Sequence, residues 1–246
     1  TISSKNMRTK DFSWNTDFIF SKTKNEITDL KSHANVLSLI SGNGFGREGY
    51  PVRGLFSIPF AGLTEDGLPT FINQDGQKTI SSFNFQEYEK LDFLKYEGPT
   101  DPTITGSFGN ILTYKNLKLN VFVTYSFGNV IRLDPVFSNA YSDLDAMPKE
   151  FKNRWMKAGD ENVTNIPTIV STRMNQQYAY LNMAYNAYNY SDVRIADGGF
   201  IRLKEISLSY DLPAKVINFF RLNKLQLKLQ ATNLCLLYAD SKLNGQ

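Results

Sequence analysis

Residues Leu117–Phe127, LKLNVFVTYSF, alternate in character with a period of two. One set of positions is apolar throughout: Leu117, Leu119, Val121, Val123, Tyr125 and Phe127. The other set is polar except for one aromatic: Lys118, Asn120, Phe122, Thr124 and Ser126. This period is typical of a β-strand whose two faces meet different surroundings. At about 3.3 Å per residue the strand extends roughly 36 Å, and a tilt of about 45° reduces its height to about 25 Å, that of the apolar band of a membrane barrel.

Four further stretches repeat the alternation. Thr105–Tyr114 is separated from Leu117–Phe127 by Lys115 and Asn116 alone. A two-residue connection is typical of a tight hairpin, and Asn tolerates the positive φ that such turns need. The other three stretches are Asp11–Phe20, Glu205–Leu212 and Lys224–Thr232. The sequence therefore predicts an all-β fold made of long antiparallel strands.

Connections of two lengths join these strands. Tight connections are expected at Lys22–Asn25, Lys115–Asn116 and Pro213–Leu222, and long irregular ones at residues 41–101 and 128–199. Outer-membrane barrels have short periplasmic turns and long extracellular loops. We therefore expect a segment of a large transmembrane β-barrel, with the apolar faces toward lipid. The polar positions of the first strand are then expected to face the lumen: Lys118, Asn120, Thr124 and Ser126.

The composition excludes several other classes of protein. The 246 residues are 41% hydrophobic and 21% charged, which is typical of a folded chain and not of a disordered one. The net charge of +3 gives no reason to expect a nucleic-acid partner. One histidine, His33, and one cysteine, Cys235, cannot form a disulfide framework or a His/Cys zinc site, and no cofactor or metal is expected.

Two motifs are better interpreted as loops than as sites. Gly44–Gly49 matches the pattern G-x-G-x-x-G, but Tyr50 and Pro51 follow where a dinucleotide site needs a helix. Asp143 and Asp145 form a carboxylate pair without a partner motif, which favours a solvated loop over catalysis.

Aromatic residues are abundant and gather at the ends of the expected strands. The chain has 13 Tyr, 18 Phe and 2 Trp, and Tyr114, Tyr125 and Phe127 all lie near strand ends. Aromatic girdles of this kind are typical of membrane barrels. The same pattern also fits a soluble, aromatic-rich β-domain that binds glycan at the cell surface through exposed Trp and Tyr. The periodicity alone leaves both possibilities open.

Short motifs are distributed in order along nearly the whole chain. They are GYPVRGLF at 49–56, FAGL at 60–63, TGSFGN at 105–110, VFVTYSFG at 121–128, FKNRW at 151–155, FIRLKEISLSY at 200–210 and ATNL at 231–234. In order and spacing this set resembles the SusC/RagA family of TonB-linked outer-membrane transporters.

The resemblance implies a 22-stranded barrel with an N-terminal plug, of which residues 1–246 would be the C-terminal part. The plug, the TonB box and the last strands are expected to be absent from this chain. The implied partners are a SusD-like surface lipoprotein, outer-membrane lipid and, through the absent N-terminal part, TonB–ExbB–ExbD. The implied cargo is an oligosaccharide or a peptide, imported across the outer membrane of a Gram-negative bacterium. Such a protein is a transporter and not an enzyme.

The long connection at residues 128–199 is expected on the extracellular, binding side. The residues predicted to contact the substrate or the SusD-like lipoprotein, which would act as a lid over the barrel, are Arg154, Trp155, Tyr178 and Tyr180. Tyr178 and Tyr180, like Tyr188 and Tyr190, are spaced by two, so a strand with girdle aromatics is an alternative for this stretch. A third possibility, an outer-membrane barrel enzyme, would need a serine partner for His33 that no motif indicates.

Overall fold

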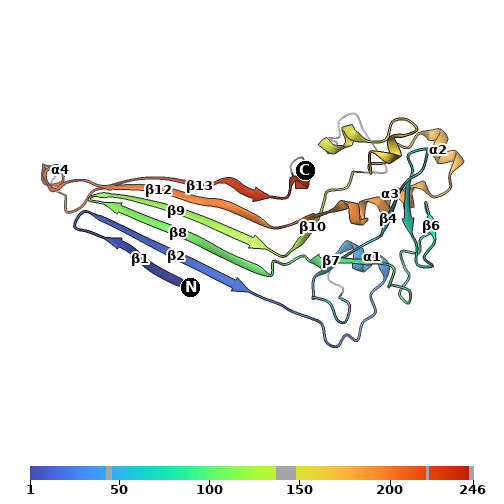
Figure 1. Ribbon diagram of the computed structural model, residues 1–246, viewed down its shortest axis with the longest axis horizontal. Helices are drawn as coiled ribbons and strands as arrows, with labels where there is room; N and C mark the ends of the chain where they lie inside the picture. The colour runs from blue at the N-terminus through green and yellow to red at the C-terminus, as the bar shows by residue number, and fades with distance from the viewer. Residues whose placement is uncertain (43–45, 137–147, 220–221, 244–246) are drawn as a thin grey trace. The chain divides into compact units, whose positions relative to one another are not determined.

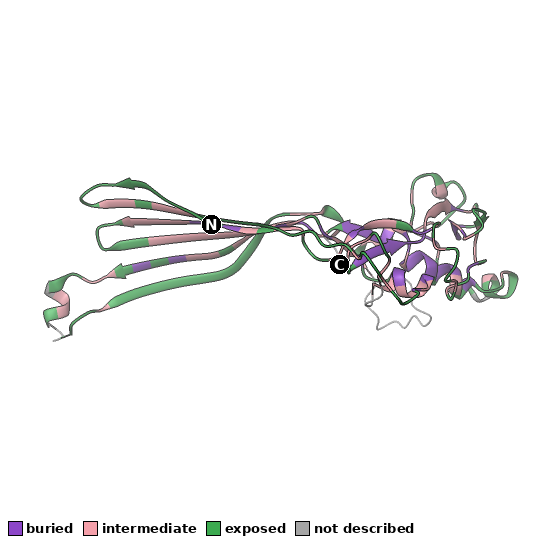
Figure 2. Ribbon diagram, turned by 90° about the horizontal axis from the view of Figure 1, so that it is seen from below, coloured by how far each residue is buried: buried purple, intermediate pink, exposed green. Residues whose placement is uncertain are grey.

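The computed structural model describes residues 1–42, 46–136, 148–219 and 222–243. Its regular structure is mostly strand with a few short helices, which confirms the all-β class in coarse form. The chain divides into two compact units. The first comprises Thr1–Thr23, Pro102–Gly128 and Gly198–Ala239, and the second comprises Lys24–Asp101, Asn129–Asp197 and Asp240–Gln246. Buried residues concentrate in the second unit (Figure 2).

The first unit is an antiparallel sheet with six strands among the described residues (Figure 1). The strands are β1 (Ile2–Arg8), β2 (Phe12–Lys22), β8 (Ile104–Tyr114), β9 (Leu117–Phe127), β12 (Phe200–Asp211) and β13 (Gln226–Ala239). Their order in space is their order in the chain. The bounds of β9 are those predicted, and β2 and β8 agree with their predictions to within two residues at each end.

The strand register keeps each face of the sheet uniform. Trp14 of β2 lies opposite Leu112 of β8, which lies opposite Leu119 of β9. The row continues through Leu208 of β12 to Leu229 of β13. Because a slip of one residue would move every side chain to the other face, this register is what gathers the apolar positions of neighbouring strands on one side.

The short connections meet at one end of the sheet (Figure 1). The Lys115 N–H donates to the Asp11 carbonyl at 2.7 Å, and the Asp211 N–H donates to the Asn116 carbonyl at 2.9 Å. The two-residue hairpin predicted at Lys115–Asn116 is confirmed, but the positive φ expected of the asparagine falls on Lys115, at 51°. Helix α4 (Ala214–Phe219) lies in the third short connection, between β12 and β13.

The tight connection predicted at Lys22–Asn25 is wrong. Strand β2 ends at Lys22, opposite Ile104, and the Thr23 N–H donates to the Thr103 carbonyl at 2.8 Å. The chain then continues into the second unit. The tight turn next to β2 lies instead at its other end, between β1 and β2, where the Thr9 N–H donates to the Phe12 carbonyl at 2.7 Å. The long connections therefore all leave the sheet at the end opposite the short turns.

The second unit combines short strands with short helices. Its main elements are α1 (Val36–Ser41), β3 (Gly54–Ser57), β4 (Phe60–Leu63), β5 (Pro69–Ile72), β6 (Lys78–Thr79), β7 (Lys95–Pro99), β10 (Val130–Arg132), α2 (Thr172–Gln177), α3 (Leu181–Asn189) and β11 (Ile195–Asp197). Strand β5 pairs with β4 and β6, while β3 pairs with β7 and β10 with β11. Single-turn 3₁₀ helices lie at Lys149–Asn153, Asp160–Asn162, Asp192–Arg194 and Ser241–Leu243. Over the described ranges, every helix is too short or too polar to cross a bilayer.

Helix α1 contributes to an aromatic-rich core in this unit. Asn35 caps the helix by accepting from the Ser38 N–H at 2.9 Å, and the Ser38 hydroxyl accepts from the Asn35 N–H in return. This capping box fixes the start of a six-residue helix that would be marginal alone. Its fully buried side chains then pack into a cluster with aromatic residues from several elements, among them Phe56, Phe71 and Tyr188.

Arg132 of β10 connects the carbonyl groups around this core. Its guanidinium donates to the Ile40 carbonyl at 3.0 Å and to the Phe56 carbonyl at 2.7 Å. The same group lies 5.3 Å from the ring centroid of Tyr190. Burial lowers the pKa of Arg132 to about 10. One side chain thus supplies hydrogen bonds to backbone carbonyl groups at the end of α1 and in β3.

Some residues named from the sequence lie outside the described ranges. These are Asp143, Asp145 and the first two residues of the motif Gly44–Gly49. The described remainder of that motif, residues 46–49, forms a turn and no helix.

Candidate functional site

The four residues predicted to face the lumen share the polar face of the sheet. Lys118 and Asn120 lie opposite Ser209 and Ser207 of β12, and Thr124 lies opposite Arg202. Ser126 follows one pleat further along the same face and is buried. Lys118 and Asn120 also line a groove of about 290 Å³. The rest of its lining comes from β8, from β12 and from β13: Ile111, Glu205, Ser207, Ser209, Gln226 and Lys228.

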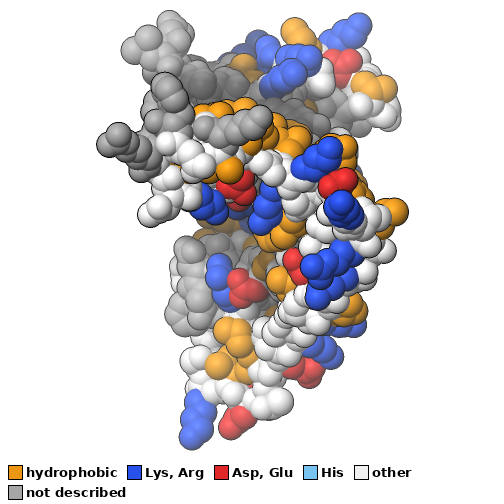
Figure 3. Space-filling model, turned by 90° about the vertical axis from the view of Figure 1, so that its left-hand side faces the viewer, with side chains coloured by type: hydrophobic (Ala, Val, Ile, Leu, Met, Phe, Trp, Pro, Cys, Tyr) orange, Lys and Arg blue, Asp and Glu red, His pale blue; other side chains and the backbone are white. Residues whose placement is uncertain are grey.

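The groove is charged at both ends. Near the short turns, Lys118 and Lys228 flank Ser209 from its two neighbouring strands. Over the part of the chain that the structure describes, neither lysine has an ion-pair partner. Two pleats away, Glu205 accepts a hydrogen bond from the Asn120 side-chain amide at 3.3 Å. Figure 3 looks onto the end with the short turns and shows Lys and Arg side chains distributed over it.

The opposite face of the sheet is apolar and exposed. Trp14, Leu208 and Leu229 of its middle row are all exposed, Leu229 to 76%. Further exposed apolar side chains lie on this face along the strands: Phe18, Phe20, Phe108, Tyr114, Leu117, Tyr210 and Leu227. An apolar surface of this extent is unusual for a protein in water and is typical of a surface that is covered by a partner or by lipid.

An aromatic belt crosses this apolar face toward the end where the long connections leave. The ring centroids of Phe18 and Tyr125 are 6.2 Å apart, those of Tyr125 and Phe127 6.1 Å, and those of Phe127 and Tyr238 6.1 Å. These rings come from β2, β9 and β13. The gathering of aromatics that the sequence predicted at strand ends is therefore present as one connected series.

A polar group interrupts the apolar face near its middle. The Asn110 side-chain oxygen accepts from the Trp14 indole N–H at 2.8 Å and from the Thr16 hydroxyl at 2.8 Å. The Asn6 amide donates to Thr16 in turn, at 2.6 Å. These partners lie far from Asn110 in the sequence, so the local pattern does not reveal them. Their mutual hydrogen bonds lower the cost of keeping these polar groups in an apolar setting.

In the second unit, Trp155 and Tyr178 meet the same turn. The turn joins β4 to β5 and has Gly67 at a φ of 74°. The Trp155 ring packs so closely on Gly67 that a Cβ there would overlap it. Its indole N–H donates to Glu161 at 3.0 Å, while the Tyr178 hydroxyl donates to Asp66 at 2.8 Å. Two of the predicted contact residues are thus brought together, each held by a carboxylate.

The other two predicted contact residues differ in their surroundings. Arg154 is half-buried, with its guanidinium 5.5 Å from the centroid of the Phe151 ring. Tyr180 is 73% exposed and has a φ of 63°, in the left-handed region that tyrosine rarely occupies. An exposed aromatic in a strained backbone conformation is a candidate contact residue.

The interpretation of the tyrosine-rich stretch as strand is wrong. Tyr185 and Tyr188 lie in the helix α3, three residues apart, and both are buried. The Tyr185 hydroxyl donates to the Thr168 carbonyl at 2.6 Å. Burial raises the pKa of Tyr188 well above that of a free tyrosine. These two rings therefore belong to the core of the unit, and the exposed candidate of the group is Tyr180.

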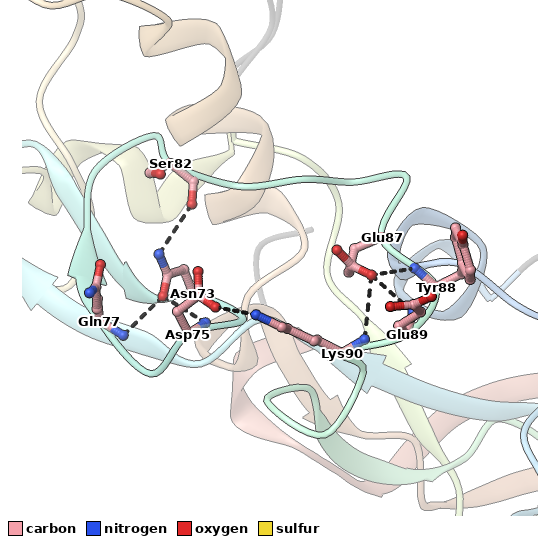
Figure 4. A network of polar contacts seen from close by, with 8 residues as sticks. All are labelled: Asn73, Asp75, Gln77, Ser82, Glu87, Tyr88, Glu89 and Lys90. Carbon is pink, nitrogen blue, oxygen red and sulfur yellow. Dashed lines mark hydrogen bonds and ion pairs between the residues drawn. The ribbon is translucent and has the colours of Figure 1, made fainter.

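Two exposed loops of the second unit are connected by a polar network (Figure 4). Asn73 accepts from the Asp75 and Gln77 N–H groups at 3.0 and 2.9 Å, which closes the turn between β5 and β6. The Lys90 ammonium lies 2.6 Å from Asp75. Glu87 accepts from backbone N–H groups of its own loop, and these bonds lower the pKa of Glu87. The contacts fix both loops without presenting an open ligand site.

His33 does not take part in a recognisable catalytic arrangement. It is exposed and lines a cavity of about 220 Å³ together with Arg47, Glu48 and Tyr88. Arg47 forms an ion pair with Asp92. Among the described residues, no group of three or more His, Cys, Asp or Glu side chains is arranged to hold a metal ion.

The chain resembles known proteins in sequence and in fold, although no protein-family model matches it. TonB-dependent receptor P3 of Formosa agariphila is 24% identical over 257 residues, which is 95% of this chain and 23% of that protein. TonB-dependent receptor P26 of the same organism is 24% identical over 99% of this chain and 24% of its own length. The chain thus spans about a quarter of the length of the curated relatives that it matches.

Solved structures resemble the fold over the same extent. A chain in the structure of the RagAB peptide transporter matches with a TM-score of 0.65 at 21% identity, covering 96% of this chain and 25% of that one. The RagAB peptide importer in its open-open state gives the same TM-score at 20% identity. The relatives are named as receptors and transporters, which fits the expectation of a protein that is not an enzyme. The resemblance to the SusC/RagA family of TonB-dependent transporters, predicted from the motifs, is confirmed by curated TonB-dependent receptors over 95% of the chain and by the fold of RagAB.

Proposed function

We propose that this chain forms the C-terminal part of the barrel wall of a TonB-dependent importer in the outer membrane of a Gram-negative bacterium. The observation that carries the proposal is the two-faced sheet, with one face apolar and exposed across neighbouring strands and the other polar. Lipid accommodates the first face and a water-filled lumen the second. The implied barrel has 22 strands and an N-terminal plug, to which residues 1–246 would be C-terminal.

The exposure of the apolar face favours a membrane wall over a soluble glycan-binding domain. A soluble sandwich would cover this face with a second sheet at about 10 Å. In the described part of the chain, Leu229 and Leu227 are instead 76% and 60% exposed. The aromatic belt of Phe18, Tyr125 and Phe127 also fits a girdle at a membrane interface better than an interior core.

The topology of the connections supports an assignment of the two sides of the membrane. We assign the short turns to the periplasm, so that the long connections of the second unit belong to the extracellular side. There they would meet a SusD-like lipoprotein and an oligosaccharide or peptide, with Trp155, Tyr178 and Tyr180 as candidate contacts. Coupling to TonB–ExbB–ExbD would run through the N-terminal part of the full protein. RagAB, which resembles this fold, is described as a peptide importer.

Fractionation and uptake test the proposal in the full-length protein. We expect it in the outer membrane, extractable only with detergent, and we expect uptake of its cargo, sought with a panel of labelled oligosaccharides and peptides, to stop when TonB is deleted. Deletion of residues 157–165 should leave outer-membrane assembly intact, because an exposed loop tolerates change, and should reduce uptake or lipoprotein co-purification. Recovery of the full-length protein from buffer without detergent would contradict the membrane assignment.

A further inference from the structure

The polar groove near the short turns has the chemistry of an anion-binding site. It is formed on one face of β9, β12 and β13, with Ser207 and Ser209 at its floor, where they are 5% and 9% exposed. At about 290 Å³ it lies near the lower limit of small-ligand sites. Hydroxyl groups at the floor and ammonium groups at the side supply donors to a single occupant.

The two lysines of the groove are placed to act on one group. Lys118 on β9 and Lys228 on β13 both lie opposite Ser209, so their Cα atoms are two strand spacings apart, or about 10 Å. Each side chain has a flexible four-carbon stem, which lets both ammonium groups converge on an oxyanion between them. A shared anion would relieve their mutual repulsion, and no carboxylate among the described residues pairs with either lysine.

Two other lysines, near this end of β12 and β13 or along them, already have partners. Lys224 lies 3.8 Å from Asp211, and Lys204 donates to the Asn233 side chain at 2.7 Å. Glu205, the acidic residue of the groove, lies two pleats from Ser209 and accepts from Asn120. At the lysine end, Asp211 lies one pleat beyond Ser209 and is paired with Lys224 and Gln226, so among the described residues Lys118 and Lys228 are the unpaired charges at this end of the groove.

We propose that Lys118, Lys228 and the hydroxyl groups of Ser207 and Ser209 form a subsite for the oxyanion of a small ligand, a sulfate ester or a carboxylate. The proposal deepens the proposed function and rests on it only in treating the polar face as the lumen of an importer. In that setting the subsite favours cargo that carries a negative charge. Binding itself needs no transport, so it can be measured apart from uptake.

Calorimetric titration of the full-length protein in detergent tests the subsite. The probes are glucose 6-sulfate, glucuronate and uncharged glucose, at low salt and at 0.5 M salt. We expect one or both charged sugars to bind more tightly than glucose, with the preference reduced at high salt because screening weakens the attraction. The relative affinity of the two charged sugars identifies the oxyanion. Equal affinity for all three sugars would overturn the proposal.

Matched variants separate the charge of the site from general damage. Lys118→Gln and Lys228→Gln should each weaken binding of the charged sugar about tenfold, the usual effect of losing a hydrogen bond to a charged group. Lys5→Gln removes a lysine from the same face outside the groove and should have no effect. Glu205→Gln removes a negative charge and should leave affinity unchanged or increased. Loss of affinity in Glu205→Gln as large as in the lysine variants would show structural damage and overturn the subsite.

Discussion

Tyr125 lies directly over Gly106 on the neighbouring strand, and its hydroxyl donates to the Ile19 carbonyl one strand further on at 2.8 Å. A Cβ at position 106 would overlap both the tyrosine ring and that carbonyl. The absence of a side chain at Gly106 therefore lets one aromatic ring bridge three strands. Because the ring also stacks on Phe18, the glycine fixes the place of the aromatic belt.

Gly106→Ala should destabilise the refolded full-length barrel by about 1–3 kcal/mol, the usual cost of overpacking. The added methyl group must displace Tyr125 and break its hydrogen bond. Gly109→Ala on the same strand is the control, since its Cβ would lie 3.2 Å from the Phe122 ring and 3.9 Å from the Asp17 Cβ, without overlap with a backbone atom. Urea unfolding measures both variants. Equal free energies of unfolding for the two would show that the Tyr125 bridge does not contribute.

The strands of the sheet could be predicted where the alternation is unbroken. Strand β9 has one apolar and one polar face along its whole length, and its predicted bounds are correct. Strand β1, ISSKNMR, has no such alternation and was missed. Strands β12 and β13 are longer than predicted. Bulges near Lys204 and Asn233 each insert a residue, so the alternation of apolar and polar side chains changes phase there and the predicted strands stop at the bulges.

The second unit was less predictable because its signals depend on partners that are distant in the sequence. Tyr178 and Tyr180, spaced by two, suggested a strand, yet Tyr178 is fixed by Asp66 and followed by a helix. The groove on the polar face likewise needed the pairing of β9 with β12. Lys118 and Lys228 are brought to either side of Ser209 by strand register, which composition and local spacing do not reveal.

The orientation of the sheet predicts unequal effects of a buried charge on its two faces. Val121→Lys, in the middle of the apolar face of β9, should cost about 2–4 kcal/mol in a refolded full-length barrel, the usual cost of a lysine at the middle of a bilayer. Thr124→Lys on the polar face should cost much less. Both variants are compared by unfolding in lipid vesicles. Similar penalties at the two positions would contradict the assignment of faces.

The short turn at Lys115–Asn116 predicts the topology of the protein in the cell. In a Cys235→Ser background, Lys115→Cys should resist a membrane-impermeant thiol reagent on intact cells and react once the outer membrane is opened. Val163→Cys, at a site that is 83% exposed in the second unit, should react on intact cells. Labelling at position 115 before permeabilisation would invert the proposed topology.

The hydrogen bond from Tyr178 to Asp66 predicts a local effect on the turn between β4 and β5. Tyr178→Phe should raise amide exchange around Gly67 several-fold while leaving the core near Phe71 unchanged, because opening of the turn is local. The bond also raises the pKa of Tyr178. A raised pKa means that the stabilising bond is present below the ordinary tyrosine pKa of about 10 and is lost as pH rises through the raised value. Unchanged exchange in Tyr178→Phe would exclude the bond as a restraint.

The contact between Trp155 and Glu161 predicts an acid-sensitive change in the candidate contact region. Backbone hydrogen bonding and the Trp155 indole lower the pKa of Glu161, so the interaction is complete above the ordinary glutamate pKa and is lost as pH falls through the lowered value. Emission from Trp155, obtained as the difference between the full-length protein and its Trp155→Phe variant, should be constant from about pH 7 to 5 and change below about pH 4. Glu161→Ala should show the acid spectrum already at pH 7, whereas Asp66→Ala, which leaves the indole bond intact, should retain the native spectrum. An unchanged spectrum in Glu161→Ala would mean that packing on Gly67 alone holds the ring.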